Sequence, residues 1–144
     1  MRISDVLRVK GDQVVTVTPD TDVRQLLTVL AEHRIGAVVV SVDGSTVNGI
    51  VSERDIVRAL ADRGAAVIDE PVTAIYTENV YTVGLEADLE QLMRTMTERK
   101  VRHLPVVRDG ALVGIVSIGD IVKRRIDELE TEHSALTNYI VGDR

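Results

Sequence analysis

The chain has 144 residues, of which 44% are hydrophobic and 28% charged, with a formal net charge of −6. The acidic balance argues against nucleic-acid binding, which needs clustered lysine and arginine, and three tyrosines are the only aromatic residues that could stack on bases. The absence of cysteine excludes disulfides, thiolate zinc sites and a cysteine nucleophile.

The N-terminal segment does not read as an export signal. Ser4 and Asp5 stand where a signal peptide would need an apolar stretch. No apolar run approaches the roughly 18 residues of a membrane span. We therefore expect a cytoplasmic protein with neither membrane nor nucleic-acid partners.

The first part of the chain alternates strand and helix signals. Leu26, Leu30 and their apolar neighbours follow the spacing of a helix with one buried face. Asp43 and Gly44 form a hairpin signal between two β-branched runs. The predicted elements are a lead-in helix over 3–9, a strand over 14–17, a helix over 23–31, strands over 37–42 and 47–51, and a helix over 53–63.

The same elements recur later in the chain. Residues 15–44 and 81–110 are identical at nine of 30 positions, and 47–57 match 112–122 at seven of 11. Each copy is a β-α-β-β-α unit, and one unit of about 60 residues would be marginally stable alone. We expect the two units to pack on each other. The predicted division is a first repeat with its lead-in helix over 1–64, a linker over 65–71, a second repeat over 72–123, and a helical extension over 124–144.

The most similar segment of the two copies is Gly-Ile-Val-Ser-x-x-Asp, which ends a strand and opens a helix. A helix N-terminus has unpaired N–H groups that suit phosphate, and Ser52 or Ser117 adds a hydroxyl there. Gly49 or Gly114 would give room for close approach of a ligand. An acidic residue three positions on can accept hydrogen bonds from both hydroxyls of a ribose. The combination indicates a nucleotide.

A simpler interpretation of the motif is a helix cap. In a capping box, a serine and an acidic residue three positions later satisfy the N–H groups at the start of a helix. Duplication of a cap would look the same as duplication of a binding site. Spacing alone favours the cap.

Two tandem β-α-β-β-α units that end in this motif, with VRHLPVV before the second hairpin, resemble a CBS-domain pair, or Bateman module. The resemblance extends from about Ile3 to Lys123. It implies an α/β (α+β) fold in which two repeats are related by a pseudo-twofold axis. It also implies a regulatory, non-enzymatic protein that requires no cofactor. The expected ligand is an adenosyl compound such as AMP, ATP, NAD or S-adenosylmethionine, bound in two clefts between the repeats.

Carried over residue by residue, the resemblance assigns Asp55 and Asp120 to ribose hydroxyls and Ser52 and Ser117 to phosphate. One cleft would join Ser117 and Asp120 to Val15, Ile35, Gly36 and Ala37. The other would join Ser52 and Asp55 to Tyr81, Val101, Arg102 and His103. Because Arg54 in the first motif corresponds to Gly119 in the second, we expect the Asp55 cleft to be the more tolerant of anions.

Other kinds of site have little support in the sequence. The three histidines, at positions 33, 103 and 133, have no carboxylate or thiol at metal-ligand spacing, so no metal site is expected. No phosphate-binding glycine loop or serine-nucleophile elbow is present. We expect no enzymatic activity.

The C-terminal segment carries an apolar seam. Apolar residues and one histidine are spaced 4, 3, 4, 3 and 4 positions apart, which is the a/d pattern of nearly three heptads. This helix either packs on its own domain or pairs with a second chain, which would make a homodimer with His133 in the contact. The seam residues are Val122, Ile126, Leu129, His133, Leu136 and Ile140.

Two functions follow from these observations. The first is a regulatory module that binds an adenine nucleotide and signals to an unknown effector protein by a shift between two arrangements of its parts. The alternative is a constitutive assembly module without a ligand, whose Ser-x-x-Asp segments are only caps.

Overall fold

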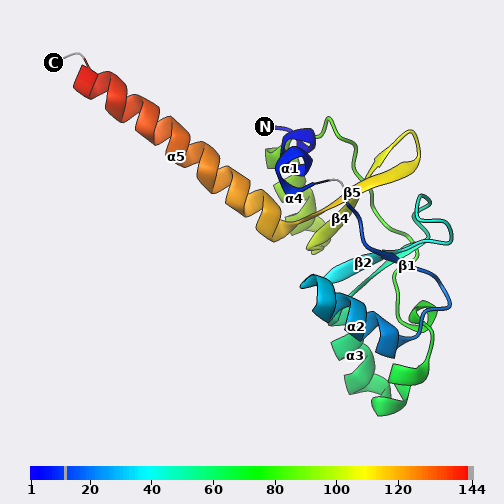
Figure 1. Cartoon of the computed structure of the whole chain (residues 1–144). Helices are drawn as coiled ribbons and strands as arrows, with labels where there is room; N and C mark the ends of the chain where they lie inside the picture. The colour runs from blue at the N-terminus through cyan, green and yellow to red at the C-terminus, as the bar shows by residue number, and fades with distance from the viewer. Residues whose placement is uncertain (12, 143–144) are drawn as a thin grey trace.

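The computed structural model describes residues 1–11 and 13–142 and consists of two similar halves followed by a long helix (Figure 1). The predicted helix over 53–63 is confirmed in full as α3, since Ser52 begins it and Gly64 ends it. In chain order the elements are α1 (Ile3–Lys10), β1 (Thr16–Val17), α2 (Val23–His33), β2 (Ala37–Val40), β3 (Gly49–Ser52), α3 (Glu53–Arg63), the 3-10 helices η1 (Ala65–Asp69) and η2 (Val72–Ala74), α4 (Leu89–Arg99), β4 (His103–Arg108), β5 (Ala111–Ser117) and α5 (Ile118–Gly142).

Each half has a small sheet. In the first half β1 pairs in parallel with β2, and β2 pairs antiparallel with β3. In the second half β4 and β5 form an antiparallel pair. A single parallel bridge between Val83 and Val106 stands where the first half has β1. The sheet is therefore reduced in the second half, but the predicted α/β order of both repeats is confirmed.

The two hairpin turns form at the predicted places with different lengths. Asp109 and Gly110 both have positive φ, and they connect β4 directly to β5 in the manner of a two-residue hairpin turn. The first hairpin has a longer loop, in which the Asp43 carboxylate accepts hydrogen bonds from the Ser45 and Thr46 N–H groups at 2.9 and 2.7 Å. These bonds lower the pKa of Asp43 to about 2.

The segment that leads into each half, α1 before the first half and η2 before the second, packs in the core of the opposite half. The apolar face of α1 is buried in the core of the second half, through Ile3, Val6 and Leu7, beside α4 and β5 (Figure 1). Val72 of η2 is buried in the core of the first half. Each half is therefore completed by a segment that lies next to the other half in the sequence, so the two halves are interlocked.

The glycines of the repeated motif make room for this exchange and not for a ligand, which corrects the sequence interpretation. A Cβ on Gly114 would lie 2.8 Å from the Leu7 methyl groups, and one on Gly49 would lie 2.7 Å from the Thr77 carbonyl and against the Tyr76 ring. Gly114 therefore lies under α1, and Gly49 lies under the residues that directly follow η2.

Replacing Gly49 with alanine is expected to destabilise the fold by roughly 1–3 kcal/mol, because backbone and an aromatic ring would have to move. The matched change Gly114→Ala should cost clearly less, since it meets only the flexible end of Leu7. Urea unfolding of both variants measures the difference. Equal stability of Gly49→Ala and wild type would contradict this account of the glycines.

Helix α5 leaves the body of the molecule after its first turns (Figure 1). Ile121 is buried against the second half, whereas Leu129, Leu136 and Ile140 are 47%, 63% and 60% exposed. The seam of this helix is thus not covered by the chain itself. Over the described residues, none of the helices has the length and apolar character needed to cross a membrane.

Candidate functional site

A cleft of about 410 Å³ lies between the two halves, next to the N-terminus of α3. Its volume falls within the range of small-molecule sites in proteins. Both halves contribute to it, as expected for a site that joins two repeats. The lining residues are Gly36, Ala37, Ile50, Ser52, Glu53, Arg54, Asp55, Arg58, Thr77, Asn79, Val80, Tyr81, Arg99, Lys100, Val101, Arg102, His103 and Leu104.

The carboxylate of Asp55 is turned toward the start of its own helix. Its Oδ2 accepts hydrogen bonds from the N–H and the hydroxyl of Ser52 at 2.8 and 3.0 Å, and the Asp55 N–H donates to the Ser52 Oγ at 3.4 Å. The capping interpretation is therefore confirmed here. Within the described chain the hydrogen bonds to Asp55 use only Oδ2, which leaves Oδ1 able to accept from a ligand.

The backbone amides at this helix start are less available than the sequence suggests. The Glu53 N–H donates to the Gly36 carbonyl at 2.9 Å, and the Asp55 N–H is bonded to Ser52. Two of the first three amides of α3 are thus already used. A phosphate here would depend mainly on side-chain cations.

All seven predicted residues of the Asp55 cleft line the same cleft. Ser52, Arg54 and Asp55 face Tyr81, Val101, Arg102 and His103 across the two halves. Gly36 and Ala37 line this same cleft, although the resemblance assigns them to the other one. Val15 and Ile35 pack instead against the core of the first half.

The cleft contains three basic residues that sequence reasoning missed. Arg58 lies one helical turn after Arg54, so its spacing of four could have revealed it. Arg99 and Lys100 end α4, and the Arg99 guanidinium lies 4.1 Å from the centre of the Tyr81 ring. Together with Arg54 and Arg102, these residues give the cleft five cationic side chains beside two acidic ones, although the formal net charge of the chain is −6.

The equivalent position in the second half has a different neighbour. Asp120 Oδ2 accepts from the Ser117 N–H at 2.9 Å, so this motif is also a capping box, and it accepts from the Lys10 Nζ at 2.6 Å. Burial of Asp120 opposes ionisation, but the hydrogen bonds from Lys10 and Ser117 outweigh it and hold the pKa of this carboxyl below its ordinary value.

His103 lies between the two motifs. Burial lowers the pKa of this imidazole, and so does the nearby charge of Lys10, while Asp120 and Glu53 act in the opposite direction. The net pKa is below the usual histidine value, which favours the neutral ring. A neutral imidazole can both donate and accept a hydrogen bond at this junction.

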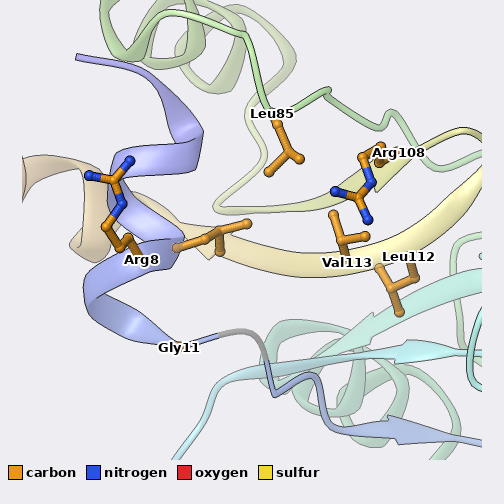
Figure 2. A pocket seen from close by; sticks show the side chains of 7 residues that line it. Arg8, Gly11, Leu85, Arg108, Leu112 and Val113 are labelled. Atoms are coloured by element: carbon orange, nitrogen blue, oxygen red, sulfur yellow. The ribbon is translucent and has the colours of Figure 1, made fainter.

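A second hollow of about 590 Å³ lies between α1 and the β4–β5 hairpin (Figure 2). Arg8 and Arg108 stand on opposite sides of it, and aliphatic side chains lie between them. None of its lining residues carries a carboxylate or hydroxyl, so it lacks a group that could bind a ribose. Despite its larger volume, this hollow contains none of the predicted site residues.

Metal binding has no visible basis in the described residues. Within 1–11 and 13–142, no three histidine, aspartate or glutamate side chains gather closely enough to hold a metal ion.

Comparison with known proteins agrees with this architecture. The CBS domain matches the chain twice, over residues 3–62 and 72–127. The chain belongs to the CBS-domain family. Because the first match begins at Ile3, it includes helix α1, which the fold places in the core of the second half.

Several CBS-domain proteins, including two with solved structures, are similar to most of this chain. A CBS-domain-containing protein from Agrobacterium tumefaciens is 43% identical, with a TM-score of 0.84 over 87% of this chain and 99% of its own. A CBS-domain protein from Pyrobaculum aerophilum, crystallised in complex with AMP, is 31% identical, with a TM-score of 0.74 over 83% of this chain and 89% of its own. The mitochondrial CBS-domain-containing protein CBSX3 of Arabidopsis thaliana is 34% identical, over 97% of this chain and 72% of its own length.

Proposed function

We propose that this chain is a regulatory module that binds an adenine nucleotide in the Asp55 cleft. The observation that carries the proposal is the concentration of five cationic side chains around a cleft that also holds a ribose-type acceptor. The AMP complex of the Pyrobaculum aerophilum relative supports the choice of ligand.

The phosphate would lie between basic groups from both halves. Arg54 and Arg58 come from α3, whereas Arg99, Lys100 and Arg102 come from the second half. Arginine binds phosphate oxygens through paired N–H groups, and this recognition is strengthened where water is partly excluded.

The nucleoside would occupy the rest of the cleft. Oδ1 of Asp55 would accept from a ribose hydroxyl, while Oδ2 keeps its hydrogen bonds to Ser52 in the helix cap. Ala37, Ile50 and Val101 supply apolar surface for a base.

Signalling would depend on the fact that both halves contribute basic residues to the cleft. Without an anion, basic groups from two interlocked halves repel each other across the cleft, and a bound phosphate reduces this repulsion. The ligand therefore favours the arrangement in which the halves are close, and an effector protein that contacts both halves can respond to this change.

Titration calorimetry with AMP, ADP, ATP, NAD, S-adenosylmethionine and adenosine tests the proposal. AMP should bind at least about tenfold more tightly than adenosine, because charge-assisted hydrogen bonds to the phosphate are each worth about 1.5–3 kcal/mol. The advantage of AMP should shrink in high salt. Lack of binding by every compound at millimolar concentration, or equal affinity for AMP and adenosine, would contradict the proposal.

A ligand-free assembly module is the second candidate. It is favoured by one observation, the completion of both Ser-x-x-Asp segments as helix caps without any ligand. The same titration decides between the two, since this candidate predicts no binding of any nucleotide.

The proposal includes a homodimer formed through α5. Around the axis of α5 the seam residues from Ile126 to Ile140 lie roughly 60–140° away from Ile121, which is buried in the body of the molecule, so the seam can meet a second chain. Seam residues from Ile126 to Ile140 repeat at heptad spacing, which suits pairing with an identical helix.

A further inference from the structure

The two Ser-x-x-Asp motifs differ in the contacts that their aspartates make with residues outside the motif. In the second half Lys10 Nζ donates to Asp120 Oδ2 at 2.6 Å and to the Ile115 carbonyl at 2.9 Å. The side chains of Lys10 and Asp120 are only 37% and 26% exposed. In the described chain Asp55 has no such ion pair.

Lys10 is held in this position by the fold. It is the last residue of α1, whose buried face is part of the second core. Gly11 follows with a φ of 97° and ends the helix there. The ammonium group therefore reaches Asp120 from an anchored helix, and not from a free chain end.

The first half has a short, uncharged residue at the corresponding place. Leu7 lies on Gly114 as Tyr76 lies on Gly49, so counting three residues onward aligns Lys10 with Asn79. Asn79 lines the Asp55 cleft.

The equivalent carbonyl groups of β3 and β5 also accept hydrogen bonds from different kinds of donor. The Ile50 carbonyl accepts from the Thr77 backbone N–H at 2.9 Å, whereas the equivalent Ile115 carbonyl accepts from Lys10 at 2.9 Å. In the first half a backbone N–H group supplies the hydrogen bond that the Lys10 ammonium group supplies in the second half. In the described chain no side-chain cation is hydrogen-bonded to the Asp55 carboxylate, which accepts only from Ser52.

We propose that Lys10 is a built-in occupant of the Asp120 position, so that each chain binds one nucleotide, in the Asp55 cleft. This inference rests on the proposed function. A ribose diol would have to compete with the ammonium group for Asp120 and leave Lys10 without its partners. An ionised Asp120, favoured by its lowered pKa, keeps this contact across the neutral pH range.

The test is the number of AMP molecules bound per chain, measured by calorimetry and by equilibrium dialysis. Wild type should bind one. Lys10→Met keeps a flexible side chain of similar length without the charge, and it should raise the number to two. Arg8→Met, on the same helix but paired with Asp5, is the matched control and should leave the number at one. Circular dichroism melting shows that the variants are folded.

Each outcome separates this inference from the proposed function. Two molecules bound by wild type, or one molecule bound by wild type and also only one by folded Lys10→Met, would overturn the role of Lys10 while nucleotide binding stands. One molecule bound by Lys10→Met but none by wild type would support the role of Lys10 and overturn the Asp55 cleft as the site. No binding by either protein would overturn both.

The double variant Lys10→Met with Asp55→Asn gives an independent check. The site that Lys10→Met adds at Asp120 should keep its affinity in this variant, because the two positions lie in different motifs, whereas the Asp55 cleft keeps at most the affinity of Asp55→Asn. If the folded double variant binds AMP with the same number and affinity as Asp55→Asn alone, the Asp120 position is not a latent site and the inference is wrong.

Discussion

Replacing Asp55 with alanine is expected to weaken AMP binding roughly 10- to 150-fold. A ribose hydroxyl that donates to a carboxylate makes a charge-assisted bond worth about 1.5–3 kcal/mol, and this bond is lost in the variant. The Asp55 cleft would keep its five cationic side chains, so residual binding through the phosphate should remain. Calorimetry with AMP measures the change in affinity.

Asp120→Ala is the matched control for this experiment. It removes the same kind of capping box, together with the ion pair to Lys10, so its effect on stability should equal or exceed that of Asp55→Ala. Its effect on AMP affinity should be negligible, since Asp120 is not in the occupied cleft. Equal loss of affinity in the two variants would show that the effect comes from helix stability and not from contact with the ligand.

The charge at Asp55 can be separated from its capping role. Asp55→Asn retains a side-chain oxygen that can accept from the Ser52 N–H, but it lacks the negative charge. An affinity close to that of Asp55→Ala would assign the effect to the ligand, whereas full recovery of wild-type affinity would show that the charge is not needed.

The local features of this fold could be predicted from the sequence. The helix over 53–63 follows from its capping serine, its apolar spacing and Gly64. The turn at Asp109 and Gly110 follows from a residue pair that tolerates positive φ. Such signals depend on residues close together in the chain, and they hold wherever the segment packs.

The interlocking of the halves could not be predicted in this way. The apolar face of α1 packs in the core of the second half, where Leu7 lies over Gly114, more than 100 residues away in the sequence. A similar distance in sequence separates Lys10 from Asp120. Pairs of this kind are brought together only by the complete fold, so the sequence alone indicates neither the packing role of the motif glycines nor the contact of Lys10 with Asp120.

The residues of the Asp55 cleft also differ in whether they can be recognised from local sequence or only from the complete fold. Arg54 and the Ser52–Asp55 spacing can be recognised within one motif, and Arg58 follows from helical periodicity. Arg99 and Lys100 look like ordinary cations at the end of a helix, where they complement its dipole. Their place beside the cleft becomes visible only when α4 is packed against its neighbours.

Replacing Leu136 with glutamate is expected to convert a homodimer into a monomer. Loss of a buried leucine costs about 2 kcal/mol or more, or about 30-fold in association, and each dimer would lose two and place two carboxylates in the seam. Val141→Glu is the matched control, because Val141 is 63% exposed but lies off the seam. Sedimentation equilibrium over a range of concentrations should give a dimer for wild type and for this control, and a monomer for Leu136→Glu.

The charges beside the seam favour a parallel pair. In that orientation Arg125 lies opposite Glu130 of the partner subunit, which is an attractive g–e pair. The antiparallel register that would bury the whole seam sets Glu130 and Glu132 opposite their own copies. The repulsion between these carboxylates disfavours it.

The orientation can be measured directly, because the chain has no cysteine of its own. In a parallel dimer Ile140→Cys should form an intermolecular disulfide under mild oxidation, since identical a positions face each other. In the full antiparallel register the two thiols would lie at opposite ends of the seam and remain reduced. A wild-type monomer at every concentration would contradict the dimer, and a stable dimer without this disulfide would contradict its parallel arrangement.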